Sequence, residues 1–581
     1  MFHRNTLLAI FFVLSILTLA IAPLAAQDDN VDVYGRALPE DAAPYEMQIW
    51  QEMCTSASTQ TNFMAAVTVY QRICQPGTSD MFGDSLVNLD ENLGLIPAAA
   101  ESWEPSEDGL TWIFHLRPGQ VWSDGTPLTA NDWVVTWRWM ANPDNAYDFV
   151  WMWQGLIDGW SEAVAGEIPP EEIGMEAVDD LTLAIRTVAP APYLPSTMFF
   201  WPPLQAAALE EFGPNYVNDP ATSVSSGPFI LREFVAGERI LLEANPTYNG
   251  FRQPWLREIR GLYGDKLNGS FLAFQDHEID RVGYEFLAPA DFEVITSDPA
   301  LLENYLPNPG DFRTDYLLLD TFNPPFDDRN VRLAFAKAVD RDAIVDNVIN
   351  VNFQLAVPAY SFLAPGYPAW DVDGELKDIQ AYDCEAAQAL LSDAGYPNGE
   401  GFPPLELLLR SESEFNAQRF IATAASISDC LNVEISVNNI ESATYMDRLL
   451  ERPTTVQIGA ISYGMDYIDP ANMMGVWVST GRHSWRNAEF DELVQQANSF
   501  VGDPQERLEM YQQAERLLVE DVGGIFLNHR IQGDLFQPYI AGECFRPNAQ
   551  GLSAWQWGND WCWGSIYITE EVVDLDTFRT R

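Results

Sequence analysis

The 581-residue sequence lacks the short motifs that mark common catalytic and metal sites. It contains no GxSxG nucleophile elbow, no GxxxxGK[ST] phosphate loop, no HExxH helix and no CxxC pair. Its five histidines are scattered along the chain, so a metal site built on them has no support from spacing. We therefore expect a protein without a metal or cofactor, and not an enzyme.

Basic residues are also scarce. The chain has 31 lysines and arginines against 85 aspartates and glutamates, which gives a formal net charge of −54. Such a surface repels nucleic acids and anionic membranes, so we expect no nucleic-acid partner. A solvated acidic exterior that keeps an exported protein soluble is the simpler interpretation; attraction of cationic ligands is the alternative.

No period of 20–50 residues repeats, which argues against solenoids and propellers. The composition is that of a folded protein, with 47% hydrophobic and 12% aromatic residues, and the length predicts two or three domains. Strand-like and helix-like patterns alternate and indicate a mixed α/β fold. Strands are predicted at 110–116, 181–186, 405–409 and 433–437, and helices at 130–140, 330–348, 386–394, 420–431 and 504–520.

The first 26 residues are typical of a signal peptide. An uncharged apolar stretch from Thr6 to Ile21 precedes the small residues Ala25 and Ala26, and a polar run starts at Gln27. No cysteine stands directly after these small residues, so we see no lipid-attachment site. We expect cleavage and a periplasmic or extracellular location; an uncleaved membrane anchor is the alternative.

The six cysteines suggest disulfide bonds in an oxidising compartment. Nearest-neighbour pairing would join 54 to 74, 384 to 430 and 544 to 562, although six cysteines allow fifteen connectivities. Buried free thiols are the alternative. The candidates are Cys54, Cys74, Cys384, Cys430, Cys544 and Cys562.

Tryptophans are dense between residues 133 and 160. Trp133, Trp137 and Met140 fall at helical spacing, which favours core packing. Trp151 and Trp153 follow the break at Pro143, and we predict that they line a binding cleft, because aromatic faces contact apolar side chains and sugar rings.

Several segments then match a known family in its order along the chain. Residues 101–137 read ESWEPSEDGLTWIFHLRPGQVWSDGTPLTANDWVVTW, and residues 226–248 read SGPFILREFVAGERILLEANPTY. The run Asp466-Tyr467-Ile468-Asp469-Pro470 follows near the C-terminal end. The similarity spans roughly residues 85–540. The sequence resembles the family 5 extracellular solute-binding proteins of ABC importers, the peptide- and nickel-binding group.

The resemblance implies a two-lobed periplasmic-binding-protein clamshell (type II, cluster C-like) with an additional small inserted domain. Domain I would comprise residues 27–78, 203–315 and 529–581, the inserted domain II residues 79–202, and domain III residues 316–528. It also implies a monomer that holds its ligand between the lobes and delivers it to permease and ATPase subunits in the membrane.

The family's residues carry over unevenly. Asp466 matches an aspartate that pairs with the α-amino group of a peptide. The other matched positions are Tyr316, Phe149, Tyr463 and, by uncertain alignment with an arginine that binds the peptide C-terminus, Arg410. Ala460 replaces a family arginine, Ser442 a family tryptophan, and Arg313 and Gly464 a family disulfide.

The resemblance thus predicts a binding protein for a peptide, in particular an oligopeptide. An oligosaccharide ligand is the alternative within the family. A secreted hydrolase, or a chemosensory or chaperone-like protein, are the alternatives from other classes.

Overall fold

The computed structural model describes residues 30–54, 64, 66–68, 81–263, 266–351, 355–547, 553 and 560–571. The predicted signal peptide and Cys74 lie outside these ranges. A search of the described ranges finds no helix with the length and apolarity needed to cross a membrane.

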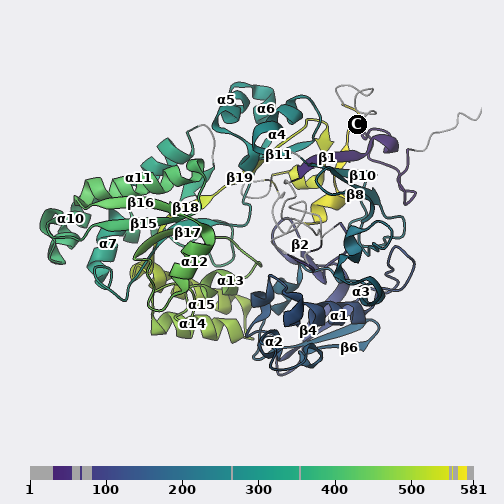
Figure 1. Ribbon diagram of the computed structural model, residues 1–581, viewed down its shortest axis with the longest axis horizontal. Helices are drawn as coiled ribbons and strands as arrows, with labels where there is room; N and C mark the ends of the chain where they lie inside the picture. Colours follow the sequence, from purple (N-terminus) through teal and green to yellow (C-terminus); the bar gives the residue numbers. More distant parts are fainter. Residues whose placement is uncertain are drawn as a thin grey trace, which may run out of the picture.

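The first lobe contains two sheets built from segments far apart in the sequence (Figure 1). One sheet has the strand order β1 (Ile49–Cys54), β10 (Glu258–Tyr263), β9 (Arg239–Ala244) and β8 (Phe229–Val235). The other is antiparallel, with the order β11 (Arg281–Gly283), β19 (Gln532–Phe536) and β12 (Tyr305–Asn308), and lies near helices α4 (Lys266–Gln275), α5 (Pro289–Ser297) and α6 (Pro299–Glu303). We use "first lobe" for residues 30–54, 203–308 and 532–571.

A separate antiparallel sheet lies below the first lobe in Figure 1. Its strand order is β4 (Ala100–Pro105), β5 (Thr111–Leu116), β7 (Thr182–Arg186) and β6 (Met175–Asp179). Helix α1 (Ala130–Ala141) begins where predicted, because the Asp132 carboxylate accepts the Thr129 N–H at 2.9 Å. Trp133 and Trp137 are buried in the core, as the helical spacing predicts. We call residues 81–202 the β4–β7 unit.

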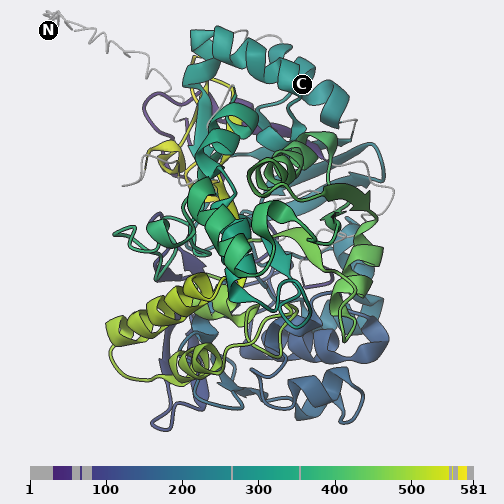
Figure 2. The ribbon, with the colours of Figure 1, turned by 90° about the vertical axis from the view of Figure 1, so that its left-hand side faces the viewer.

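The second lobe, residues 314–530, is built on a six-stranded mixed sheet. Its order is β14 (Ala356–Pro358), β18 (Gly524–Arg530), β13 (Thr314–Leu319), β17 (Ile458–Tyr463), β15 (Leu405–Arg410) and β16 (Ile435–Ile440). Figure 2 looks onto this lobe from outside, where α7 (Arg329–Lys337), α10 (Cys384–Asp393) and α11 (Glu414–Leu431) cover the sheet. Helices α12 (Ser442–Leu450), α13 (Pro470–Gly475), α14 (Ala488–Ser499) and α15 (Pro504–Glu520) complete the lobe.

The chain passes between the two lobes twice. It leaves β12 of the first lobe and enters β13 after residues 309–313, and it returns from β18 to β19 through Ile531 alone. The two strands of the second lobe that carry these crossings, β13 and β18, are hydrogen-bonded neighbours. The lobes are therefore joined by two adjacent linkers, which makes the fold a two-lobed mixed α/β clamshell.

One predicted helix is interrupted. The prediction of a continuous helix over 330–348 is wrong, because α7 ends at Lys337 and a separate helix, α8 (Arg341–Ile344), begins after Asp340. The Asp340 carboxylate accepts the Ala343 N–H at 3.0 Å and caps the new helix. The break carries Arg341 into the interior, where it is 1% exposed. The other predicted elements are present, with ends shifted by up to six residues.

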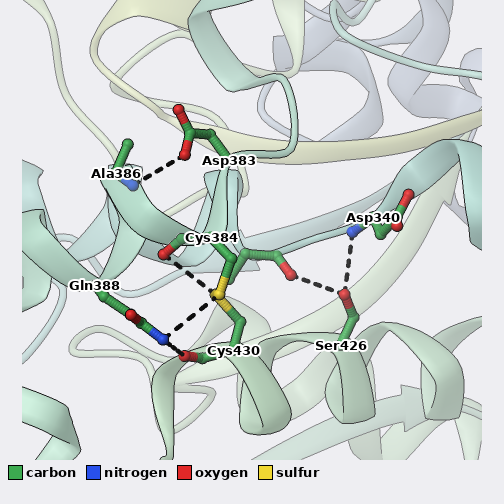
Figure 3. The surroundings of a disulfide bond; sticks show 8 residues. Asp340, Asp383, Cys384, Ala386, Gln388, Ser426 and Cys430 are labelled. Carbon is green, nitrogen blue, oxygen red and sulfur yellow. Dashed lines mark hydrogen bonds between the residues drawn. A yellow bond between two sulfur atoms is a disulfide. The ribbon is translucent and has the colours of Figure 1, made fainter.

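The cysteines follow the nearest-neighbour expectation only in part. Cys384 and Cys430 form a disulfide that joins the start of α10 to the end of α11 (Figure 3). Gln388 reinforces this junction by donating to the Cys430 carbonyl at 2.8 Å. Cys54 is disulfide-bonded. Cys544 and Cys562 are both buried thiols, so the 544–562 disulfide that we predicted is not formed in the described part of the chain.

Candidate ligand-binding site

Asp466 lies on the turn between β17 and α13, and only one of its carboxylate oxygens is engaged. Oδ2 accepts from the Tyr463 hydroxyl at 2.5 Å and from the Asn472 amide at 3.0 Å. The Asn472 Oδ1 atom in turn accepts the Asp466 N–H at 2.8 Å. Within the described residues, Oδ1 of Asp466 has no hydrogen-bond partner. The turn therefore holds the side chain in place and leaves one oxygen available.

The Asp466 side chain does not cap the following helix. Asp469 does so instead, accepting the Ala471 N–H at 2.9 Å, and Arg507 binds both oxygens of Asp469 at 2.7 and 2.8 Å. Burial raises the pKa of Asp466, and the hydrogen bonds from Asn472 and Tyr463 act against this rise. An arriving cation would favour the ionised form and offset the desolvation.

Tyr316 lies next to this turn on β13, opposite Ile461 of β17. It is fully buried, and its hydroxyl is 2.8 Å from Nε2 of His483. His483 stacks on Trp477 with ring centroids 3.9 Å apart, and its Nδ1 is 2.6 Å from the Val476 carbonyl. Burial lowers the pKa of His483 to about 3, so the ring is neutral at physiological pH. The neutral ring donates from Nδ1 and accepts the Tyr316 proton at Nε2.

Arg482, the residue before His483, was not among the predicted site residues. Its guanidinium carbon lies 4.7 Å from the centre of the Tyr463 ring, a cation–π distance. Its Nε and Nη2 atoms are buried and meet no acceptor at hydrogen-bond geometry within the described ranges, although its charge acts on the nearby Tyr316 hydroxyl and lowers the pKa of that group against the effect of burial. The sequence gives no signal for this role, since Arg482 lies outside every quoted motif.

Arg410 lies at the end of β15 and is exposed. Its Nε atom donates to the Ser442 hydroxyl at 2.9 Å. Arg410 and Ser442, which both align with pocket residues of the family, are therefore in direct contact. Ala460, in the middle of β17, is buried and carries no charge to this region.

The predicted aromatic residues of the β4–β7 unit divide into core and surface. Trp153 is 0% exposed and packs against Trp137, Trp160 and Trp201, with ring centroids 4.7–5.4 Å apart. The prediction that Trp153 lines a cleft is therefore corrected, because its faces are covered by other rings. Trp151 is 40% exposed and contacts Phe149, which is buried, at 4.5 Å.

The β4–β7 unit touches the second lobe immediately beside Asp466. Tyr193 of this unit stacks on Tyr467, with an interplanar angle of 9° and centroids 5.9 Å apart. The Arg507 guanidinium carbon lies 5.9 Å from the Tyr193 ring. In Figure 1 helices α13–α15 lie beside the blue β4–β7 unit. The Asp466 turn is thus positioned where separate parts of the chain meet.

Two lobes on paired linkers, with buried polar groups where they meet, are the features of a clamshell binding protein. The family model for bacterial extracellular solute-binding proteins, family 5, matches residues 94–485, and the chain belongs to this family.

Two relatives show how far the similarity extends. The "Probable deoxycholate-binding periplasmic protein YgiS" of Escherichia coli (strain K12) is 28% identical over 480 residues, covering 80% of this chain and 85% of the relative. The periplasmic oligopeptide-binding protein OppA of Salmonella typhimurium is 28% identical over 470 residues, covering 77% and 81%.

Solved structures share the fold. The unliganded open form of the periplasmic murein tripeptide-binding protein MppA has a TM-score of 0.72 at 22% identity, covering 92% of this chain and 99% of its own. Haemophilus influenzae OppA in complex with RPPGFSPFR has a TM-score of 0.66 at 23% identity, covering 90% and 99%.

Proposed function

We propose that this chain is the exported solute-binding component of an ABC importer, and that it captures a peptide between its two lobes. The observation that carries the proposal is Asp466, a fixed and partly buried carboxylate with one oxygen that has no partner among the described residues. A primary ammonium supplies donors and a compensating charge, and such charge-assisted bonds are the strong ones. Relatives named as oligopeptide-, dipeptide- and murein peptide-binding proteins support the same ligand class.

The proposal includes the protein's place in transport. It is secreted by cleavage after residue 26, acts as a monomer by binding and release without covalent chemistry, and passes its ligand to membrane permease and ATPase subunits. Domains I, II and III take the boundaries given above. Opening and closing about the two linkers admits and releases the ligand.

The test is calorimetric titration of the mature protein with a defined mixture of short peptides, alongside thermal melting. Asp466→Asn keeps the size and hydrogen bonds of the side chain but removes its charge, so peptide affinity should fall by about 10- to 100-fold. N-acetylated peptides should bind wild-type protein weakly, and the substitution should not change their affinity.

The matched control is Asp373→Asn, an exposed acid of the same lobe, which should leave peptide binding unchanged. Equal binding of free and N-acetylated peptides by the wild type would remove the role of Asp466. Failure of every peptide to raise the melting temperature would remove the peptide proposal itself.

A steroid carboxylate such as deoxycholate is the second candidate, because the YgiS relative matches over 80% of this chain. The oligosaccharide hypothesis relied on Trp151 and Trp153. Because Trp153 is buried, only Trp151 still supports it. A sugar ligand should be insensitive to Asp466→Asn, which separates it from a peptide.

A further inference from the structure

Arg482 is a partly buried cation whose hydrogen bonds are incomplete. Its Nε and Nη2 atoms are shielded from solvent and have no acceptor at hydrogen-bond geometry among the described residues, where it also forms no ion pair. A polar group close to it is the Tyr316 hydroxyl, whose pKa burial raises and the charge of Arg482 lowers. A buried donor without a partner lowers the stability of the fold, and a charged one lowers it more. The fold therefore tolerates a deficit at this position.

Other buried arginines of the same lobe have a compensating partner, including Arg419, whose Nε is also unpartnered but whose Nη1 atom pairs with Asp315 at 2.6 Å. Arg507 donates to both oxygens of Asp469. Arg341 has no acidic partner, yet its guanidinium donates to the carbonyls of Phe526 at 2.6 Å, Gln380 at 2.8 Å and Ala336 at 3.0 Å. In these three cases a carboxylate or several carbonyls of the chain compensate the guanidinium, which Arg482 lacks among the described residues.

A second donor close to Arg482 is also unpartnered. The hydroxyl of Tyr445, on α12, is buried and has no hydrogen-bond partner. Burial raises the pKa of Tyr445, while the positive charges of Arg410 and Arg482 act in the opposite direction. The hydroxyl is therefore protonated and available as a donor, with Arg410, Arg482 and Glu412 as the charged groups around it.

The unfilled positions on Arg482 and Asp466 are complementary in charge and close in space. The Tyr463 ring contacts the Arg482 guanidinium on its face and bonds to Asp466 through its hydroxyl. One tyrosine side chain thus spans the separation between cation and anion. An extended chain advances about 3.3 Å per residue, so one or two residues of a ligand cover this span.

We propose that Arg482, assisted by the Tyr445 hydroxyl, binds a carboxylate of the ligand that lies within one or two residues of the amine held by Asp466. The inference rests on the proposed function for its amine partner. It assigns a short zwitterion, or a peptide with an acidic residue near its N-terminus, as the preferred substrate. A peptide and a steroid acid share only the carboxylate among the groups that this site would bind.

The experiment is calorimetric titration of the mature protein with Ala-Xaa dipeptides and with the same dipeptides as C-terminal amides. Wild-type protein should prefer the free acids by about tenfold or more, the effect of one charge-assisted hydrogen bond. Arg482→Met should lower free-acid affinity to that of the amides and leave amide affinity unchanged. Arg482→Lys should restore part of the preference, and Tyr445→Phe should weaken it.

The matched control is Arg486→Met, which removes an exposed arginine four residues further along the chain and should leave the preference intact. A preference that survives Arg482→Met, or that disappears in Arg486→Met, would overturn the assignment while leaving peptide binding in place. Equal wild-type affinity for acids and amides would do the same.

A deoxycholate arm separates this inference from the function on which it rests. If deoxycholate binds and neither the dipeptides nor the short-peptide mixture does, the peptide proposal fails, and a loss of deoxycholate binding in Arg482→Met supports the carboxylate site. Unchanged deoxycholate binding in that variant overturns the site as well. If the peptide mixture binds but neither the dipeptides nor deoxycholate do, the site is overturned and the peptide proposal stands; if nothing binds, both proposals fall.

Discussion

The interior behind the sheet of the second lobe and the turn region beside the β4–β7 unit surround an arginine side chain in opposite ways. Behind the sheet, Arg341 is 1% exposed and donates to backbone carbonyls from α7, from Gln380 and from β18. Beside the β4–β7 unit, Arg482 has two buried nitrogens without acceptors. The two side chains are chemically identical, so the difference lies in what surrounds them.

The comparison shows that the two guanidinium groups differ in how fully the chain compensates them. A guanidinium that bridges several carbonyls stabilises the folded chain, because each lost partner would remain buried and unpaired. A guanidinium without partners contributes little to the fold and is poised to bind an incoming anion. Asp466 resembles Arg482 in this respect, because one of its carboxylate oxygens is engaged and the other is available.

The largest effect should come from Arg341→Met. This substitution leaves several buried carbonyls without donors and should lower the free energy of unfolding by about 3–5 kcal/mol. Calorimetric melting measures the loss, with the exposed Arg486→Met as the control. A melting temperature equal to that of the control would erase the contrast between the two arginines.

An intermediate effect is expected at Glu515, a buried acid on α15. Its Oε1 atom accepts the N–H groups of Phe362 and Leu363 at 2.9 and 2.7 Å. Burial nevertheless raises its pKa from 4.5 to about 8, against these hydrogen bonds. The folded protein therefore keeps a proton that the unfolded chain releases between pH 4.5 and 8.

It follows that this group costs nothing below pH 4.5 and that its contribution becomes unfavourable as pH rises to about 8. The slope is at most about 1.4 kcal/mol per pH unit. Glu515→Gln keeps the accepting oxygen and should be increasingly more stable than wild type as pH rises from 5 to 8. The exposed Glu509→Gln on the same helix should show no such trend; parallel pH curves for wild type and Glu515→Gln would contradict the assignment.

The smallest effect on stability should come from Arg482→Met. The substitution leaves no partner of the guanidinium unpaired. The free energy of unfolding of the ligand-free variant should therefore lie within about 1 kcal/mol of the wild-type value, or slightly above it. A loss as large as that of Arg341→Met would mean that Arg482 is a structural residue. Its effect should appear instead in the ligand titrations.

The sequence predicted elements that depend on local chemistry. The bounds of α15, 504–520, were predicted because Asp503 and Pro504 open a strongly periodic segment, and α1 because Thr129 and Asp132 form a capping box. The break at Asp340 was missed, because it depends on burying Arg341 against β18, a contact about 185 residues away.

The candidate site was predictable to a similar degree. Asp466 follows from a motif, and the structure gives it the partners Tyr463 and Asn472. Trp151 and Trp153 are two residues apart, and no local pattern distinguishes the 40% exposed ring from the buried one. Arg482 could not be predicted, since its interest lies in partners that are missing, and a missing partner is visible only in three dimensions.

The unequal linkers have a mechanical consequence. One linker comprises residues 309–313, with Gly310 and Phe312 at positive φ, whereas the other is Ile531 alone, whose N–H donates to the Leu355 carbonyl at 2.8 Å. A one-residue tether on a strand next to a longer one permits little sliding, so the relative motion of the lobes reduces to bending about a single line. The second lobe then works as a lever arm, and a small change of angle at Ile531 becomes a large displacement at its far end.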